Sequence, residues 1–192
     1  MFFIPGILIS IITFPGVIVH ELAHQLFCRI MRVPVYEVKY FQFANPCGYV
    51  IHEGTEKPLT NFMISTGPFL INTLLGAGIL FPVAIEILEF QVYKPFINGE
   101  IANAGTLIRV PVLLVAWLGI SILMHSFPST GDADAMVSSI LKNKNVNIFV
   151  KILVTPVIGL IYLGAVGSIL WLDLVYALAI GAVLPSFIAQ FL

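Results

Sequence analysis

Long apolar runs dominate this sequence and set the strongest limit on its fold. Five of them are long enough to provide the ~20 residues that a helix needs to cross ~30 Å of hydrocarbon. They cover roughly residues 2–31, 61–88, 107–127, 148–170 and 172–192. Charged residues make up only 10% of the 192 residues, against about 25% in soluble domains. We therefore predict a single-domain, all-α polytopic membrane protein (residues 1–192) with about five transmembrane helices in a lipid bilayer.

One apolar run carries an internal break, and two others are separated by only a short step. The first is too long for one straight crossing, and Pro15-Gly16 in its middle predicts a kink, because proline removes a backbone donor and clashes with the preceding turn. The last two runs are separated only by the short polar step around Asp173. We therefore expect a tight C-terminal helical hairpin over about residues 146–192.

Basic residues are distributed unevenly among the loops. Seven of them flank the loop after the first run or the loop between the third and fourth runs: Arg29, Arg32, Lys39, Lys57, Lys142, Lys144 and Lys151. The positive-inside rule predicts that these loops are cytoplasmic. The opposite side then holds Glu86, Glu89, Glu100 and Asp173. The net charge of -1 and the lack of a basic patch argue against a nucleic-acid partner.

One segment, residues 33–54, lacks a pattern typical of a helix. Its two halves are rich in β-branched and aromatic residues, and "ANPCG" between them is typical of a turn. The pattern predicts a small β-hairpin inserted between the first and second spans. It either lies on the membrane surface or offers an edge strand that pairs with an extended peptide.

The first apolar run also contains the polar motif "HELAH". On a helix, His20 and His24 project from nearly the same face, about 6 Å apart along the axis, so both imidazoles can reach one metal ion. Glu21 is rotated by about 100° and lies beside the ion as a general base. This is the HExxH arrangement of zinc hydrolases. The alternative is that the histidines are polar contacts between membrane helices.

A catalytic zinc site needs a third protein ligand. Cys28 lies about 12 Å along the helix from His20, which is too far. Only "HSFPSTGDADAM", residues 125–136, brings carboxylates to the end of a span at the depth of the histidines. Asp132 and Asp134 would point about 200° apart on a helix, so only one of them should face the ion. We favour Asp132, with Asp134 as the alternative.

These residues together resemble the site-2 proteases, a family of intramembrane zinc metalloproteases. The likeness covers about residues 14–137 and is carried by "HELAH", by the Gly-Pro and Asn of "STGPFLIN", and by the Pro and Asp of "HSFPSTGDADAM". It implies a Zn²⁺ cofactor, a membrane-protein substrate and an active site toward the cytoplasmic side. Glu21 is then the general base that acts on a zinc-activated water.

The resemblance also implies roles for two further residues. Asn72 corresponds to an asparagine that steadies the substrate carbonyl or oxyanion, although it follows Gly67 by five residues and the family spacing is four. His125 replaces the family's asparagine in the third motif, and either stabilises the oxyanion or caps a helix end. This chain therefore looks like a divergent branch of the family.

Two other interpretations compete with this one. A membrane metal-binding, transport or scaffold protein would hold zinc without proteolysis. A different membrane HExxH architecture would take its third ligand from a later helix, and Glu86 and Glu89 are the helical residues that qualify. His52 on the second strand of the predicted hairpin reads as a surface residue, with a ligand role as the alternative. The sequence indicates neither an oligomeric state nor a particular substrate.

Overall fold

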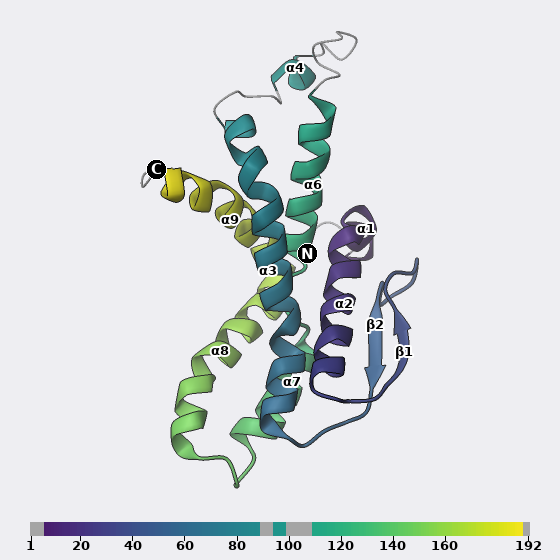
Figure 1. Ribbon diagram of the computed structural model, residues 1–192, viewed down its shortest axis with the longest axis vertical. Coiled ribbons are helices and arrows are strands. Elements are labelled where there is room, and N and C mark those ends of the chain that lie inside the picture. Colours follow the sequence, from purple (N-terminus) through teal and green to yellow (C-terminus); the bar gives the residue numbers. More distant parts are fainter. Residues whose placement is uncertain (1–5, 89–93, 99–108, 190–192) are drawn as a thin grey trace.

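The computed structural model describes residues 6–88, 94–98 and 109–189 and is mostly helical. The amino-terminal part contains α1 (Gly6–Ile12), α2 (Phe14–Ile30), β1 (Val35–Lys39), β2 (Tyr49–His52) and α3 (Pro58–Leu88). The remainder contains α4 (Lys94–Ile97), α6 (Val110–Met124), α7 (Thr130–Met136), α8 (Ile148–Gly167) and α9 (Leu172–Ala189). A π-helical turn, Val137–Leu141, follows α7, and a 3-10 turn, Ser168–Leu170, precedes α9. Figure 1 shows α3 running through the centre of the molecule.

The first apolar run is broken sharply. Helices α1 and α2 meet at an angle of 91° around Thr13. The sequence pattern predicts the kink at Pro15-Gly16, but Pro15 lies in the first turn of α2, where a proline costs no hydrogen bond. The proline therefore starts the helix that carries the histidines instead of bending it.

Helices α3 and α6 pack against each other, and both α2 and α9 pack against this pair. Their main core cluster joins Leu80 of α3, Leu123 of α6 and Ala177 of α9. Gly16 permits a close approach of α2 to α6, since a Cβ at this position would lie 1.9 Å from the Ser121 carbonyl oxygen. This approach brings the start of α2 next to His125, which ends α6.

The carboxyl-terminal helices differ from the expected tight hairpin. Helix α9 packs mainly on α3 and α6 and turns away from α8, as Figure 1 shows. Trp171, between the 3-10 turn and α9, has a left-handed backbone with φ 64°. Helix α8 instead packs against α7 through a second cluster, which includes Ala133, Met136, Ile158 and Ile161.

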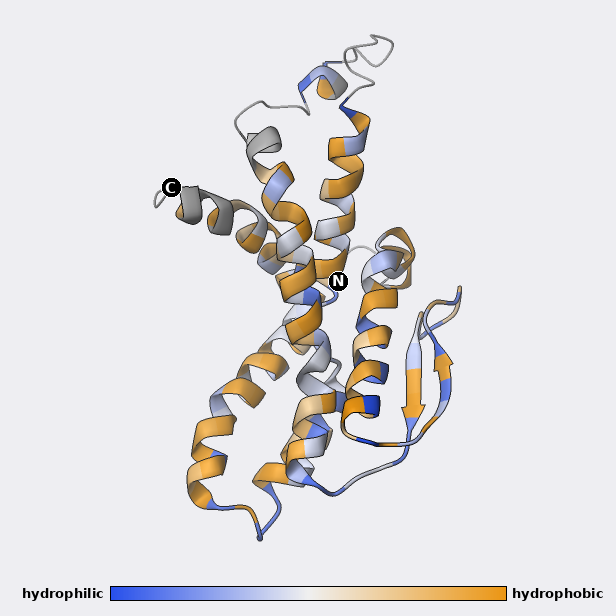
Figure 2. Ribbon diagram, viewed as in Figure 1, coloured by the Kyte–Doolittle hydropathy of each residue, from blue (hydrophilic) through white to orange (hydrophobic). Residues whose placement is uncertain are grey.

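Two helical segments, Pro58–Ala84 and Ile148–Leu170, are long and apolar enough to cross a membrane, and the bent α1–α2 pair makes a third if it counts as one span. The apolar helical segments Val110–Met124 and Leu172–Val183 are shorter. The five predicted spans are therefore not confirmed in the described part of the chain. Parts of the predicted runs, residues 2–5, 107–108 and 190–192, lie outside it. Figure 2 shows apolar residues along α3, α6 and α8.

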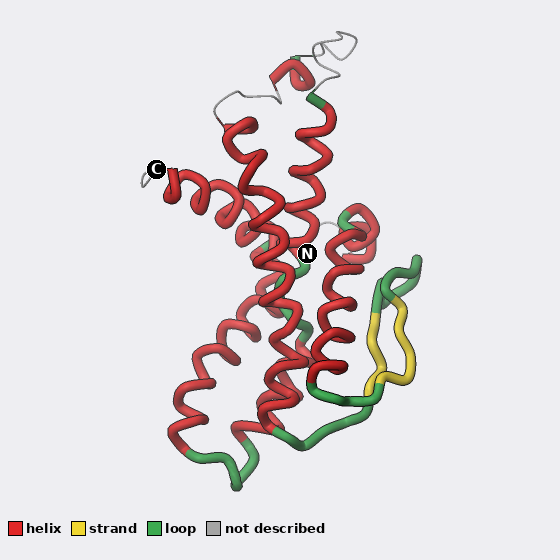
Figure 3. Tube along the Cα trace, viewed as in Figure 1, coloured by secondary structure: helices red, strands yellow, loops and turns green. Residues whose placement is uncertain are grey.

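The predicted β-hairpin is confirmed. Strands β1 and β2 pair antiparallel, with Val38 opposite Val50 and Lys39 opposite Tyr49, and the register shifts between Val35 and Glu37. Figure 3 shows this small sheet beside α2. The apolar side chain of Val35 packs on a cluster formed by α2 and α3, which fixes the hairpin against the histidine-bearing helix.

Candidate metal centre

Three side chains from two helices converge at the centre of the molecule. His20 and His24 come from successive turns of α2, and Asp132 comes from the first turn of α7. One ligand atom from each lies within 4.8 Å of the others, a spacing that can hold a metal ion. Nε2 of His24 is 3.7 Å from Oδ2 of Asp132, and the two side chains are only 11% and 19% exposed.

Both histidines are oriented by main-chain carbonyl groups. Nδ1 of His20 is 2.7 Å from the His125 oxygen, and Nδ1 of His24 is 3.1 Å from the Ile64 oxygen. A carbonyl oxygen can only accept a hydrogen bond, so each Nδ1 carries the proton. The Nε2 lone pair of each ring is then free to bind a metal, as in the usual outer-shell arrangement of metal-binding histidines.

The two accepting carbonyls have no hydrogen-bond donor within their own helices. Ile64 lies four residues before Pro68 within α3, and proline has no N–H to donate to the carbonyl four residues earlier. His125 is the cap residue at the carboxyl end of α6, where helix carbonyls lack intrahelical partners. An internal proline and a helix end thus supply the acceptors that hold the two imidazoles.

Asp132 is held by the residue that begins its helix. Ser129 is the N-cap of α7, and its side chain accepts a hydrogen bond from the Asp132 N–H. Oδ2 of Asp132 accepts hydrogen bonds from the Ser129 N–H at 2.9 Å and from the Ser129 hydroxyl at 2.6 Å. This capping box fixes the carboxylate at the start of α7, on the side of the histidines.

Asp134, the alternative third ligand, lies elsewhere. It is exposed and accepts a hydrogen bond from the Tyr162 hydroxyl of α8. Among the other potential ligands, Cys28 packs in an apolar cluster, and His52 lies 2.9 Å from the Glu53 carbonyl through Nδ1. The side chains of Glu86 and Glu89 lie outside the described residues. The structure therefore brings Asp132, and not Asp134, to the two histidines.

Glu21 lies next to this group without belonging to it. The residue is 8% exposed, on the helix that carries both histidines. The loop between β1 and β2 covers it: a Cβ added to Gly48 would lie 2.7 Å from Cγ of Glu21 and 2.9 Å from Cγ1 of Val17. Only a residue without a side chain allows the loop to sit this close to the carboxylate.

Asn72 contacts the protein main chain. It is fully buried, and its amide nitrogen lies 3.3, 3.2 and 3.0 Å from the carbonyl oxygens of Gly16, Ile122 and His125. The His125 carbonyl that it contacts is the one that accepts from His20. Asn72 does not line the cavity beside Glu21. This position favours a structural role, in which Asn72 holds α2 and α6 together around His20, over direct contact with a substrate.

The ring of His125 is joined to the bend between α1 and α2. Nε2 of His125 is 2.8 Å from Oγ1 of Thr13, and the Thr13 hydroxyl donates to the Ile9 carbonyl at 2.7 Å. A hydroxyl has one proton, so Nε2–H of the neutral His125 must donate to Thr13. In this state the single N–H of the His125 ring donates to Thr13. The ring then has no other proton with which to stabilise an oxyanion.

A cavity of about 730 Å³ opens beside this candidate metal group. His20 and Glu21 form part of its wall, together with residues 45–48 of the hairpin loop and the linker from α6 to α7. Asp173 at the start of α9 forms another part. The loop charges predict that Asp173 lies on the opposite side of the membrane from the histidines, but in the structure it lines the same cavity as His20.

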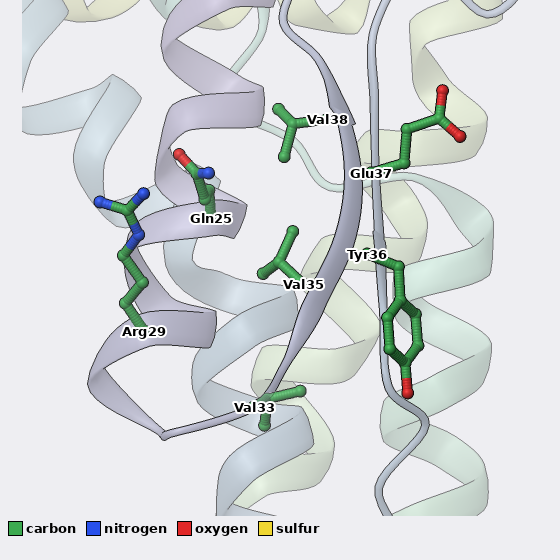
Figure 4. Close-up of a pocket in the computed structure, with 7 residues that line it drawn as sticks. All are labelled: Gln25, Arg29, Val33, Val35, Tyr36, Glu37 and Val38. Carbon is green, nitrogen blue, oxygen red and sulfur yellow. The ribbon is translucent and has the colours of Figure 1, made fainter.

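A second, smaller hollow of about 340 Å³ lies between α2 and β1. Figure 4 shows Val35 and Val38 pointing toward α2, whereas Tyr36 points away from it. The two valines are three residues apart, an odd spacing that would put them on opposite faces of a regular strand. The register shift between Val35 and Glu37 places both toward the helix.

Comparison with known proteins gives no further assignment. No protein-family model matches the chain, and neither a curated protein nor a solved structure matches it. The resemblance to site-2 proteases therefore rests on the sequence motifs alone.

Proposed function

We propose that this chain is an intramembrane zinc metalloprotease of the site-2 protease type, which hydrolyses a peptide bond in or near a transmembrane segment of a membrane protein. One observation carries the proposal. His20, His24 and Asp132 converge, and a buried carboxylate, Glu21, lies beside them in the wall of a cavity.

The donor set suits zinc. Two imidazole nitrogens and one carboxylate oxygen are ligands that zinc takes in hydrolases, and three protein ligands leave a position open. The ring orientation supports this choice, because both Nδ1 atoms are occupied by carbonyl groups. When bound, zinc would polarise a peptide carbonyl and acidify a water molecule.

Glu21 carries out the proton transfers. Its carboxylate accepts a proton from the attacking water and passes it to the nitrogen of the leaving amine. The hairpin loop above it, at Gly48, limits the movement of the side chain and shields it from bulk solvent. Both effects favour a general base held in one orientation.

The substrate must reach the site as an extended chain, because the carbonyls of a wound helix are hydrogen-bonded and shielded. A hairpin strand lies beside α2 and can hold such a segment by main-chain pairing. Its loop residues 45–48 line the cavity that reaches Glu21. The uneven distribution of basic residues among the loops favours a site toward the cytoplasmic side.

The competing proposal is a membrane protein that binds or transports zinc without hydrolysis. A transport path should carry several ionisable groups spaced along it. In the described part of the chain only one group of residues is close enough to hold an ion, and no second such group marks a path. Glu21 lies outside this group, and a protein that only binds the metal has no use for it.

The test replaces Glu21 with glutamine, which keeps its size but removes the proton acceptor. The variant should retain zinc and lose about 10²–10⁴-fold in cleavage of single-span peptides that carry helix-destabilising residues. Glu56→Gln, an exposed acid in the loop before α3, is the matched control and should behave as wild type. Zinc content and cleavage are measured on the same purified samples. Equal activity of zinc-loaded wild type and Glu21→Gln would contradict the hydrolytic function.

A further inference from the structure

The wall of the cavity beside Glu21 contains a second carboxylate, Asp173. This residue is 7% exposed, and it lines the same cavity as His20 and Glu21. Two acids and no lysine or arginine occur among the described residues of this wall. The cavity is therefore acidic, although the chain as a whole carries a net charge of only -1.

The start of α9 stabilises the Asp173 carboxylate without neutralising it. Oδ1 accepts a hydrogen bond from the Leu174 N–H at 2.9 Å, in the first turn of the helix. A helix amino terminus favours a negative charge but supplies only about half a unit of positive charge. Among the residues that the structure describes, no cationic side chain pairs with this carboxylate.

A buried carboxylate without a cation is costly unless a ligand supplies the partner. The metal group does not use Asp173, because its ligands are His20, His24 and Asp132. Among the described residues no side chain matches this carboxylate, which leaves it available to a basic group that enters the cavity. Hydroxyl groups of Ser10 and Ser168 belong to the same wall and can accept further hydrogen bonds from an ammonium or guanidinium group.

We propose that Asp173 forms a specificity subsite that binds a basic side chain, lysine or arginine, of the substrate peptide near the bond to be cut. The inference deepens the proposed function and rests on it. The cavity volume of about 730 Å³ is within the range of about 300–1,000 Å³ typical of ligand sites. Because one cavity joins Asp173 to Glu21, the basic residue and the scissile bond occupy it together.

The test compares two labelled single-span peptides that differ only by lysine or norleucine, with this residue placed at successive positions along the peptide. Binding to the detergent-solubilised protein is measured by fluorescence anisotropy. At one position the lysine peptide should bind wild type about tenfold more tightly, the effect of one charge-assisted hydrogen bond. Asp173→Asn should bind both peptides equally, because the asparagine oxygen can still accept the hydrogen bond from the Leu174 N–H but carries no charge.

Two further variants control this result. Glu56→Gln removes an exposed acid outside the cavity and should retain the preference for lysine. Asp173→Lys should reverse the preference and favour a glutamate peptide over its glutamine counterpart. Circular dichroism of every variant establishes that the helices are retained.

The outcomes separate the subsite from the protease. Equal binding of the lysine and norleucine peptides to wild type at every position overturns the inference, and so does a lysine preference that persists in Asp173→Asn. A protein that binds the lysine peptide selectively and cleaves neither peptide contradicts the protease and leaves the subsite in place. A protein that cleaves both peptides and binds them with equal affinity contradicts the subsite and leaves the protease in place.

Discussion

Substitution of Gly48 by alanine tests how tightly the hairpin loop fixes Glu21. The added Cβ would lie 2.7 Å from Cγ of Glu21, 2.9 Å from Cγ1 of Val17 and 3.0 Å from the Tyr40 carbonyl oxygen. Carbon atoms at optimal contact are about 3.5–4.0 Å apart. Either the loop or the Glu21 side chain must therefore move by roughly 1 Å.

Such a displacement should affect catalysis more than metal binding. A shift of about 1 Å in a catalytic group costs on the order of 10²-fold in rate, and overpacking of this kind costs about 1–3 kcal/mol of stability. The clash involves Glu21 and not the atoms of His20, His24 or Asp132. We therefore expect Gly48→Ala to cleave about 10²-fold more slowly with zinc content unchanged.

The assay measures cleavage of a single-span peptide, zinc content and the thermal midpoint on one preparation. Gly54→Ala is the matched control, because nothing lies within 4 Å of a Cβ at Gly54 on the same segment. A Gly48→Ala protein that is as active as wild type would show that the loop does not position Glu21. Loss of zinc together with activity would show that the clash spreads to the ligands, contrary to the geometry described.

The remaining predictions concern the metal ligands and their supports. Asp132→Ala should lose zinc and activity together, whereas Asp134→Ala should keep both; the reverse result in metal analysis would transfer the ligand role. Pro68→Ala restores an N–H that competes with His24 for a carbonyl, and zinc affinity measured by chelator competition should fall about 10–100-fold. Asn72→Leu should lower zinc affinity by a similar factor of about 10–100; a loss of cleavage with unchanged affinity would instead favour the oxyanion role that the family resemblance implies.

The elements near the metal group could be predicted from local patterns. The spacing of "HELAH" predicts two imidazoles on one helix face, and a helix is what the structure has over Phe14–Ile30. The hairpin follows from turn residues flanked by β-branched ones. The helical period separates Asp132 from Asp134 but does not say which of them faces the histidines. In the structure the capping box formed by Ser129 and Asp132 places Asp132 in the first turn of α7.

The position of Asp173 could not be predicted from such patterns. Loop charges indicate on which side of a membrane a residue lies, but not how far a helix reaches or in which direction the next one leaves. The left-handed Trp171 turns the chain so that α9 packs on α3 and α6. This contact joins segments far apart in the sequence, and Asp173 lines the cavity at the start of the helix that makes it. The sequence does not locate the break at Thr13 either. A proline can begin a helix as well as interrupt one, so Pro15 alone does not show on which side of it the chain bends.

A metal ion held by His20 and His24 of α2 and by Asp132 of α7 would also cross-link the polypeptide. Helix α7 packs on α3 and α8 and reaches α2 through the pair formed by His24 and Asp132. An ion that binds only the folded chain stabilises it by about 2.7 kcal/mol at a hundred times its dissociation constant. In the unfolded chain the same ion would have to close a loop of roughly a hundred residues between the two helices, which costs additional entropy. If the proposed site binds a metal, its supply would thus set the rigidity of the junction between the amino-terminal helices and the α7–α8 unit, quite apart from any reaction that takes place there.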